Sequence, residues 1–339
     1  MLVLVGLLTL SEPASAAGFQ AKTMRSELPP VEVERPLIIG RGWLELGLGG
    51  DVKIAREYWG DDGTRREFAD QDGTGGPDVT WLYTTQRAAI RYGIARRGEL
   101  YLTVPVHYVR LTNSYLGTDT SDFGYGDASF GWKREWYRTD APLVSIISDL
   151  FFRVGSGNEA AGTLIGGPNT VGGFVMSTGT SDLGLAVRGK GQAGPFAFQM
   201  GVGYARCFSG VSQFVIETDG HQFVGRFKPG DYIKADLNPM IQVGPLAIGA
   251  DASVQRRFSA QAGTTSPGLY HDAYLDPIAG SEGTFVDVGG NVVLNVTRNL
   301  DVGLGASVPI RGQGLAFFPL ETISPTLGPT YSGTLELRY

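Results

Sequence analysis

The sequence predicts an all-β protein, a transmembrane up-and-down antiparallel β-barrel of about twelve strands. Three observations carry this prediction: apolar and polar side chains alternate from Gly40 to the last residue, short and long connectors also alternate, and 50 of the 339 residues are glycine. Across 44–54 (LELGLGGDVKI), for example, even positions are apolar or glycine, and odd positions are polar, charged or glycine. Successive side chains of a strand point to opposite faces, so each run presents one apolar and one polar face.

The first 39 residues are predicted to precede the barrel. An apolar run over 2–10 is followed by the small triplet Ala14-Ser15-Ala16, which predicts a signal peptide over residues 1–16. Residues 17–39 are polar and contain Pro29-Pro30 and Pro36, which block helix and central strand. We expect a periplasmic segment there, either a free tail or one tucked into the barrel mouth. The barrel itself is predicted over residues 40–339.

The connectors between the alternating runs come in two lengths. Short ones are expected at 97–98, 139–142, 191–195, 244–245 and 297–299, and long ones around 60–77, 112–123, 157–171, 209–229, 260–282 and 312–328. Tight periplasmic turns alternating with longer external loops are typical of membrane barrels, and an even strand number puts both termini in the periplasm. A soluble β-sandwich also has alternating strands, but its strands usually span only about five or six residues.

Aromatic residues are expected to form two belts at the membrane interfaces. We assign the outer belt to Tyr58, Trp59, Trp81 and Tyr83, and the inner belt to Tyr101, Trp136, Tyr137, Phe196 and Tyr339. The last strand, 331–339, ends on an aromatic residue of its apolar face, which is the kind of signal that the outer-membrane barrel-assembly machinery recognises. That machinery and outer-membrane lipid are therefore expected partners.

Three stretches resemble a known family of outer-membrane barrels, named after the MetA pathway of phenol degradation and often called transporters. They are 124–133 (GYGDASFGWK), 153–158 (RVGSGN) and 179–186 (GTSDLGLA), the last continuing to Gly194-Pro195 and 201–204 (GVGY). With the later strands, the resemblance covers about residues 120–339. It implies an outer-membrane channel for small, including hydrophobic or aromatic, molecules.

The polar face of the strands is expected to line the lumen. The inward residues predicted from the alternation are Glu45, Asp51, Lys53, Arg87, Arg91, His107, Asp127, Lys133, Glu135, Asp149, Arg153, Asp182, Arg188, Lys234, Asp236, Asp251, Arg257, Asp287, Asn291, Glu336 and Arg338. Both signs of charge occur in similar number, whereas a selective pore carries mainly one sign. Most of these charges are expected to form internal ion pairs, and an open pore would pass small neutral or zwitterionic solutes with weak selectivity.

Composition argues against several other functions. The formal net charge of −6 and the lack of a basic run argue against nucleic-acid binding, and Cys207 with three histidines predicts neither a metal site nor a cofactor. Two alternatives to passive transport stay open. One is a surface-binding barrel acting through its external loops at 209–229 and 260–282; the other, less favoured, is a hydrolase using His221 and His271. The expected location is the bacterial outer membrane.

Overall fold

The computed structural model of the protein is all-β in the residues that it describes. These are 37–59, 62–67, 79–113, 118–140, 142–155, 162–163, 179–216, 221–264, 275–277, 281–297, 299–313 and 326–338. The strands of the barrel wall are β1 (Leu44–Ala55), β4 (Val79–Ala95), β5 (Gly98–Asn113), β6 (Thr118–Tyr125), β7 (Ala128–Asp140), β8 (Leu143–Val154), β10 (Asp182–Ala193), β11 (Phe196–Cys207), β14 (Tyr232–Val243), β15 (Leu246–Arg257), β18 (Gly283–Thr297), β19 (Leu300–Arg311) and β21 (Thr330–Arg338).

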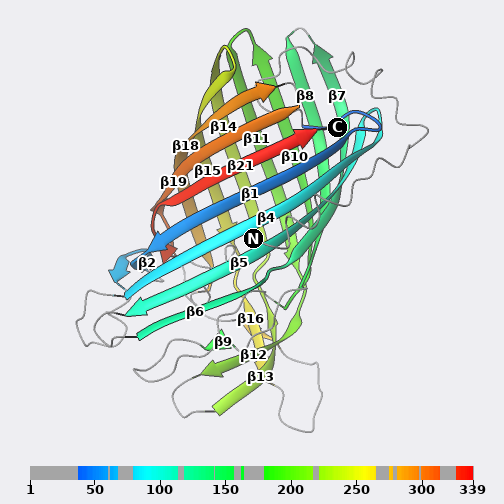
Figure 1. The fold of residues 1–339 in the computed structure, drawn as a ribbon. Coiled ribbons are helices and arrows are strands. Elements are labelled where there is room, and N and C mark those ends of the chain that lie inside the picture. Colours follow the sequence, from blue (N-terminus) through cyan, green and yellow to red (C-terminus); the bar gives the residue numbers. More distant parts are fainter. Residues whose placement is uncertain are drawn as a thin grey trace, which may run out of the picture.

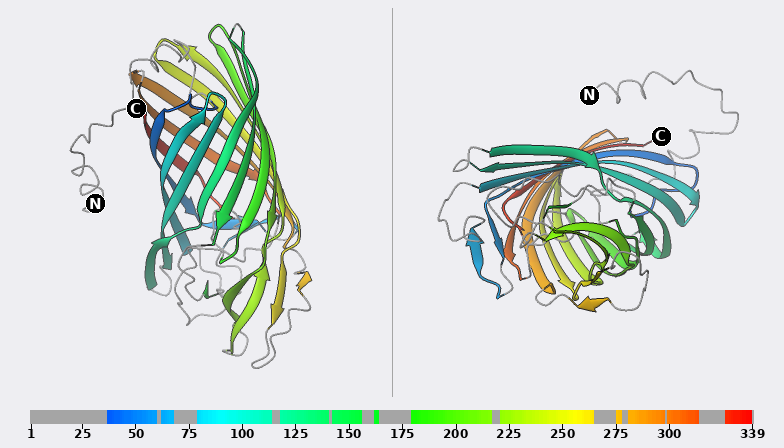
Figure 2. Two further views of the ribbon diagram at one scale, coloured as in Figure 1. Left: turned by 90° about the vertical axis from the view of Figure 1, so that its right-hand side faces the viewer. Right: turned by 90° about the horizontal axis from the view of Figure 1, so that it is seen from below.

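The sheet closes on itself as an antiparallel barrel. Strand β1 pairs with both β4 and β21, β4 pairs with β5, and the sheet then continues through β7, β8, β10, β11, β14, β15, β18 and β19 back to β21. Strands β6 and β7 both pair with β5 and form one interrupted transmembrane strand, so the closed barrel has twelve strands. The strands are steeply tilted around a central lumen (Figures 1 and 2). The predicted fold class is confirmed. No helix long and apolar enough to cross a membrane occurs in these residues.

Two of the tight turns show why the short connectors fold as they do. Gly194-Pro195 and Gly244-Pro245 each form a two-residue hairpin, with φ of 60° at Gly194 and 62° at Gly244. A type II′ turn needs positive φ at its first central residue, which glycine adopts without steric cost, and a negative φ at the second, which proline supplies. The same two-residue sequence therefore makes the same turn twice.

The opposite, external end carries shorter strands beyond the barrel wall. Strands β9 (Gly162–Thr163), β12 (Gly210–Ile216), β13 (His221–Lys228), β16 (Gln261–Thr264) and β17 (Asp276–Pro277) form one small sheet, and β2 (Glu57–Trp59), β3 (Arg65–Glu67) and β20 (Thr326–Leu327) form another. All six of the expected long connectors contain strand residues. Residues 209–229 contain the β12–β13 hairpin, and 112–123 contain the end of β5 and most of β6. The first five residues of β6 (TDTSD) are all polar, so the alternation by which strands are recognised is absent there.

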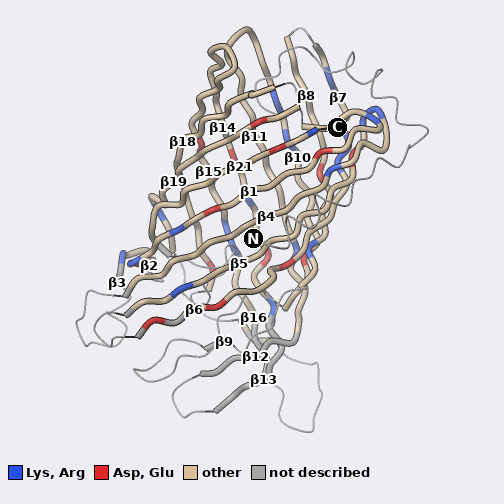
Figure 3. The backbone as a smooth tube through the Cα atoms, viewed as in Figure 1, with Lys and Arg blue, Asp and Glu red and all other residues tan. Residues whose placement is uncertain are grey.

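The outer face of the wall is apolar and exposed. Several large apolar side chains of the wall are at least half exposed. They are Leu185 on β10, Met200 and Val202 on β11, Ile248 on β15 and Leu304 on β19. Such side chains would be unfavourable in water and are the side chains that a barrel presents to lipid. Many charged residues of the wall, such as Arg91 and Asp182, have the other parity and are buried. Figure 3 marks where Lys, Arg, Asp and Glu lie along the backbone.

Trp59 of the predicted outer aromatic belt is buried, at 7% exposure, and the prediction is also wrong for Trp81 and Tyr83. Both share the inward parity of Arg87 on β4, and their rings stack inside the barrel with centroids 5.6 Å apart. Trp81 is only 4% exposed and packs with Ala55 and Val109. Of the predicted inner belt, Tyr101 also points inward, whereas Trp136, Tyr137 and Phe196 are exposed as expected. Tyr339 and the predicted signal peptide at 1–16 lie outside the described residues, as does 17–36 of the predicted periplasmic segment.

Candidate functional site

A cavity of about 520 Å³ occupies the middle of the lumen. Its walls come from strands on opposite sides of the barrel, and the polar lining residues are Asp51, Lys53, Tyr83, Thr84, Thr85, His107, Tyr108, Gln199, Lys234, Asp236, Asn238, Asp251, Ser253, Asp287, Ser307, Thr330 and Ser332. Val109 adds apolar surface. A cavity of this size, with a few convergent polar groups, is typical of small-molecule sites.

The charges around this cavity are of both signs. Asp51 forms an ion pair with Arg87, in which both side chains keep partial exposure. Asp236 and Asp287 lie on β14 and β18, in register with Ser253 on the strand between them. Lys53 and Lys234 provide the positive charges of the lining. The lining is thus mixed rather than a ladder of one sign, which argues against strong ion selectivity.

Amide side chains hold Asp251 in the wall. Asn291 donates from Nδ2 to both carboxylate oxygens at 3.0 Å, and Asn238 donates to Oδ1 from the other neighbouring strand. A glycine between them makes this possible, because a Cβ at Gly249 would lie 2.4 Å from Oδ1 of Asn291. Gly303 similarly leaves room for Thr334, whose Oγ1 would be 2.4 Å from an added Cβ. Small residues therefore keep this wall flat and the lumen wide.

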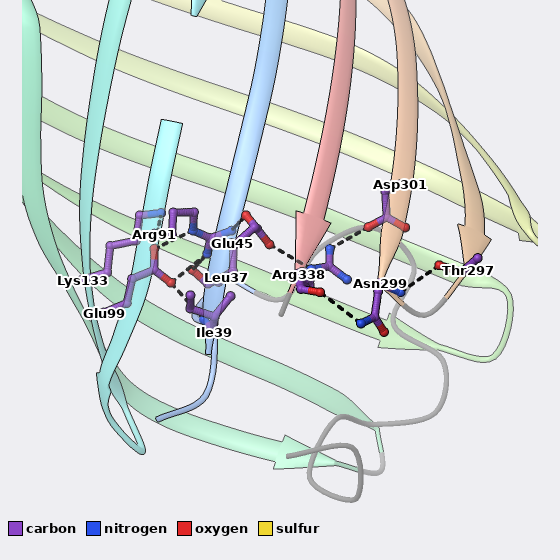
Figure 4. A network of polar contacts seen from close by, with 10 residues as sticks. All are labelled: Leu37, Ile39, Glu45, Arg91, Glu99, Lys133, Thr297, Asn299, Asp301 and Arg338. Atoms are coloured by element: carbon purple, nitrogen blue, oxygen red, sulfur yellow. Dashed lines mark hydrogen bonds and ion pairs between the residues drawn. The ribbon is translucent and has the colours of Figure 1, made fainter. Parts of the chain in front are cut away.

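A dense ion-pair network lines one side of the barrel wall at the periplasmic end of the lumen (Figure 4). Arg91 donates to Glu45 at 2.7 Å and to both oxygens of Glu99 at 2.7 and 2.8 Å. Arg338 bridges Glu45 at 2.8 Å and Asp301 at 2.6 Å. Glu45 is 1% exposed and Glu99 is fully buried. Charges this deeply buried are tolerated only because each has several partners.

The segment just before β1 is bound to this network. The backbone N–H of Ile39 donates to Oε2 of Glu99 at 2.9 Å, and Arg91 donates to the carbonyl oxygen of Leu37 at 3.2 Å. Ile39 is only 2% exposed. The three described residues of the predicted 17–39 segment, Leu37–Ile39, are therefore held against the inside of the periplasmic mouth. Lys133 completes the cluster, with Nζ 3.1 Å from Glu99.

A second buried cluster lies at the external end of the wall. Arg153 on β8 pairs with Asp182 on β10, and the fully buried Cys207 on β11 is next in register. The guanidinium of Arg257 lies 5.4 Å from the ring centre of Tyr232. Cys207 donates from its backbone N–H to Asp231 at 2.9 Å and from its thiol to the Gly230 carbonyl at 3.4 Å. These contacts connect neighbouring strands, and the thiol of Cys207 is buried among them.

The structure sorts the predicted lumen residues into three groups by height. The cavity brings together Asp51, Lys53, Arg87, Lys234, Asp236, Asp251 and Asp287; the periplasmic end holds Glu45, Arg91, Lys133, Asp149, Arg188, Glu336 and Arg338; the external end holds Arg153, Asp182 and Arg257. Asp127 belongs to none of these three groups and lies between the end of β6 and the start of β7.

Sequence reasoning missed several members of the periplasmic network. Glu99 and Asp301 each follow a tight turn and share the inward parity of their strands, so the alternation could have identified them. Tyr101 was placed in an interface belt, but its hydroxyl donates to Asp149 at 2.9 Å inside the lumen. Nothing in the sequence marks Leu37 and Ile39, whose contacts use backbone atoms.

Comparisons with known proteins identify structures that share this fold. No family model matches the chain, and no curated protein matches it. Among solved structures, the COG4313 outer membrane channel from Pseudomonas putida F1 has a TM-score of 0.63 at 11% identity, covering 92% of this chain and 100% of that chain. The NanC porin has a TM-score of 0.42 at 5% identity, covering 86% and 98%. The TodX monoaromatic hydrocarbon channel (deltaS2 mutant) has a TM-score of 0.39 at 11% identity, covering 88% and 89%.

The first of these similarities defines the class of protein. With 11% identity it shows shared architecture, and that architecture is an outer-membrane β-barrel. The similarity to the COG4313 channel extends over nearly the whole of both chains, so this chain has the fold of that channel.

Proposed function

We propose that this protein is a passive channel of the bacterial outer membrane that conducts small molecules through its lumen. The observation that carries the proposal is the cavity of about 520 Å³ enclosed by the closed barrel. The exposed apolar outer face supports a location in lipid, where only a closed barrel or a helix can satisfy its backbone hydrogen bonds. A polar lumen within an apolar shell is the arrangement of diffusion channels.

The lining favours small neutral or zwitterionic solutes. With Asp51 paired to Arg87, the remaining carboxylates of the lining are Asp236, Asp251 and Asp287, opposed by two lysines. A fixed charge close to balance repels neither sign strongly. Tyr83 and Val109 are the inward apolar residues of the lining, and its carboxylates, amides and hydroxyls can bind the polar groups of a solute.

Reconstitution with a matched pair of variants tests the proposal. Ser253 lines the cavity and its neighbour Val254 faces outward with 41% exposure. Ser253→Trp is expected to reduce single-channel conductance and liposome swelling by aromatic acids, amino acids and sugars, because the indole fills the lumen. Val254→Trp is expected to change neither, because its indole lies in lipid. A wild-type barrel that folds in the bilayer but conducts nothing would overturn the proposal.

The two alternative functions remain separate proposals with their own tests. The surface-binding role depends on the external region, where the β12–β13 hairpin extends beyond the barrel wall. Deleting 213–222, the tip of that hairpin, should abolish ligand binding and spare conductance if this role is correct. The hydrolase alternative involves His271, which lies outside the described residues. Turnover of phospholipid or peptide that is lost on His271→Ala would support it.

A further inference from the structure

Three exposed arginines lie close together at the periplasmic end of the barrel. Arg96 and Arg97 form the tip of the turn between β4 and β5. Arg134 on β7 is in register with Gly98, the first residue of β5 after that turn. The carbonyl oxygen of Arg97 accepts a hydrogen bond from the N–H of Glu135 at 3.0 Å, which holds the turn against β7. In Figure 3 this turn is blue, at the end of the barrel where the C-terminus lies.

No acidic side chain balances these arginines within the described part of the chain, where none of the three guanidinium groups pairs with a carboxylate. The acids nearest to them in the sequence, Glu99 and Glu135, are buried on the lumen side of the wall. The tight turns at 191–195 and 244–245 contain no charged residue at all. The three arginines therefore give one part of the periplasmic rim a local positive charge, and an anion from outside the chain would balance it.

Two tryptophans of β7 flank Arg134 on the outer face. The guanidinium of Arg134 lies 4.5 Å from the ring centre of Trp136, whose Nε1 donates to Ser148 at 2.9 Å. Trp132 is 37% exposed, and its Nε1 lies 3.6 Å from the position that a Cβ would have at Gly98. Among the residues that the structure describes, the indole N–H of Trp132 has no hydrogen-bond acceptor. One hydrogen-bond donor is therefore available beside the turn that carries the arginines.

The outer face next to the arginines is apolar on its membrane side. Ile94, Leu100 and Leu102 are each more than 40% exposed there. On the periplasmic side, Trp136 and Tyr137 are more than half exposed. Amphipathic aromatic rings of this kind are enriched at the level of the lipid head groups. The arginines therefore lie where a head group meets the wall, next to a surface that acyl chains can cover.

We propose that Arg96, Arg97, Arg134 and the indole of Trp132 form a binding site for an anionic phospholipid of the periplasmic leaflet. A guanidinium group binds phosphate oxygens through paired N–H donors, and Trp132 adds a further donor. The acyl chains of the lipid would lie along Ile94 and Leu100. Arg134 is on the outer face of the barrel among these apolar residues, which favours a lipid over an acidic protein of the periplasm. The site is separate from the lumen and does not depend on the channel function.

Native mass spectrometry of the refolded barrel tests the site, with phosphatidylglycerol and phosphatidylcholine of identical acyl chains as probes. The wild type is expected to retain phosphatidylglycerol several-fold more than phosphatidylcholine. The triple variant Arg96→Gln, Arg97→Gln and Arg134→Gln should lose this preference. The control triple variant, Arg56→Gln, Arg206→Gln and Arg256→Gln, should keep it.

The control removes the same total charge from exposed arginines at the external end of β1, β11 and β15. Heat-modifiable migration in gel electrophoresis shows that each variant is folded. Equal retention of the two lipids by the wild type would overturn the site. An equal loss of preference in the two triple variants would also overturn it, because net charge alone would then explain the binding.

A matched pair of tryptophan variants tests the indole donor. Trp132→Phe keeps an aromatic ring but removes the available N–H, so the preference for phosphatidylglycerol should fall by about twofold or more. Trp136→Phe should change it less, because that N–H already donates to Ser148. An unchanged preference in Trp132→Phe would contradict the site as proposed. A wild type that binds phosphatidylglycerol but does not conduct would contradict the channel and leave the lipid site in place.

Discussion

Two levels of the same lumen use the same kinds of charged residue in different ways. At the periplasmic end, Arg91 and Arg338 alternate with Glu45, Glu99 and Asp301 in a buried network in which every charge has a close partner. Halfway along the barrel, Asp236, Asp251 and Asp287 border open space. Both sets occupy inward positions of an alternating pattern. The residues paired with them on adjacent strands determine whether these charges form ion pairs that stabilise the barrel or line the cavity.

The difference teaches how a membrane barrel combines rigidity with an open lumen. At the periplasmic end, long side chains from adjacent strands meet in register, as Glu45 does with Arg91 and Arg338. At the cavity, the register places glycine or serine beside the acids, as Ser253 is placed between Asp236 and Asp287. Charges with short neighbours keep their hydration and remain available to a solute.

The largest effect is expected from removing the central cation of the network. Arg91→Met leaves Glu45 and Glu99 buried without their main partner, and breaking a buried pair in this way costs about 3–5 kcal/mol. The matched control is Arg188→Met, because Arg188 is 44% exposed and its Nε is 3.9 Å from Asp149. Urea unfolding of the refolded barrel, followed by tryptophan fluorescence, gives both values. Equal stabilities would show that burial does not distinguish the two levels.

The next effect concerns the segment before β1. Glu99→Gln removes the charge that accepts from the Ile39 N–H and from Arg91, and a hydrogen bond to a charged group contributes about 1.5–3 kcal/mol. Hydrogen exchange of residues 37–43 is therefore expected to quicken by an order of magnitude or more. Glu135→Gln is the control, because Glu135 is buried at the same end but accepts from Ser145. Unchanged exchange in Glu99→Gln would mean that Leu37–Ile39 is held by other contacts.

The fold was predictable because its signals are local. Alternation over single strands gave the two faces, and turn residues such as Gly194-Pro195 gave the hairpins, so twelve strands and their order followed from short-range patterns. Charged inward positions followed in the same way, since parity along a strand needs no knowledge of its neighbours.

The pairing of those charges was not predictable, because it depends on register between strands. Trp81 illustrates the problem: its chemistry suggested a membrane interface, but the parity shared with Arg91 places it inside. The anchoring of Leu37–Ile39 uses backbone groups that every sequence has.

A smaller effect, on selectivity rather than stability, is expected at the cavity. Asp287→Asn removes one carboxylate from a lining in which the charges are nearly balanced, so the reversal potential in a salt gradient should shift toward anions. The unfolding free energy should change little, because the side chain remains hydrated. Asp119→Asn is the control, since Asp119 is on the outer face. A large loss of stability in Asp287→Asn would place that carboxylate with the buried network instead.

The smallest effect is expected for the exposed ion pair between Arg110 and Asp119. Both side chains are nearly half exposed, 46% and 48%, so water and salt screen their attraction. Arg110→Ala and Asp119→Ala, alone and combined, should leave the urea midpoint and the conductance at wild-type values. The pair has hydrogen-bond geometry as good as that of the Arg91 network, with Arg110 Nε 2.8 Å from Asp119. If its loss nevertheless destabilised the barrel as Arg91→Met does, contact geometry rather than burial would determine what a charge contributes.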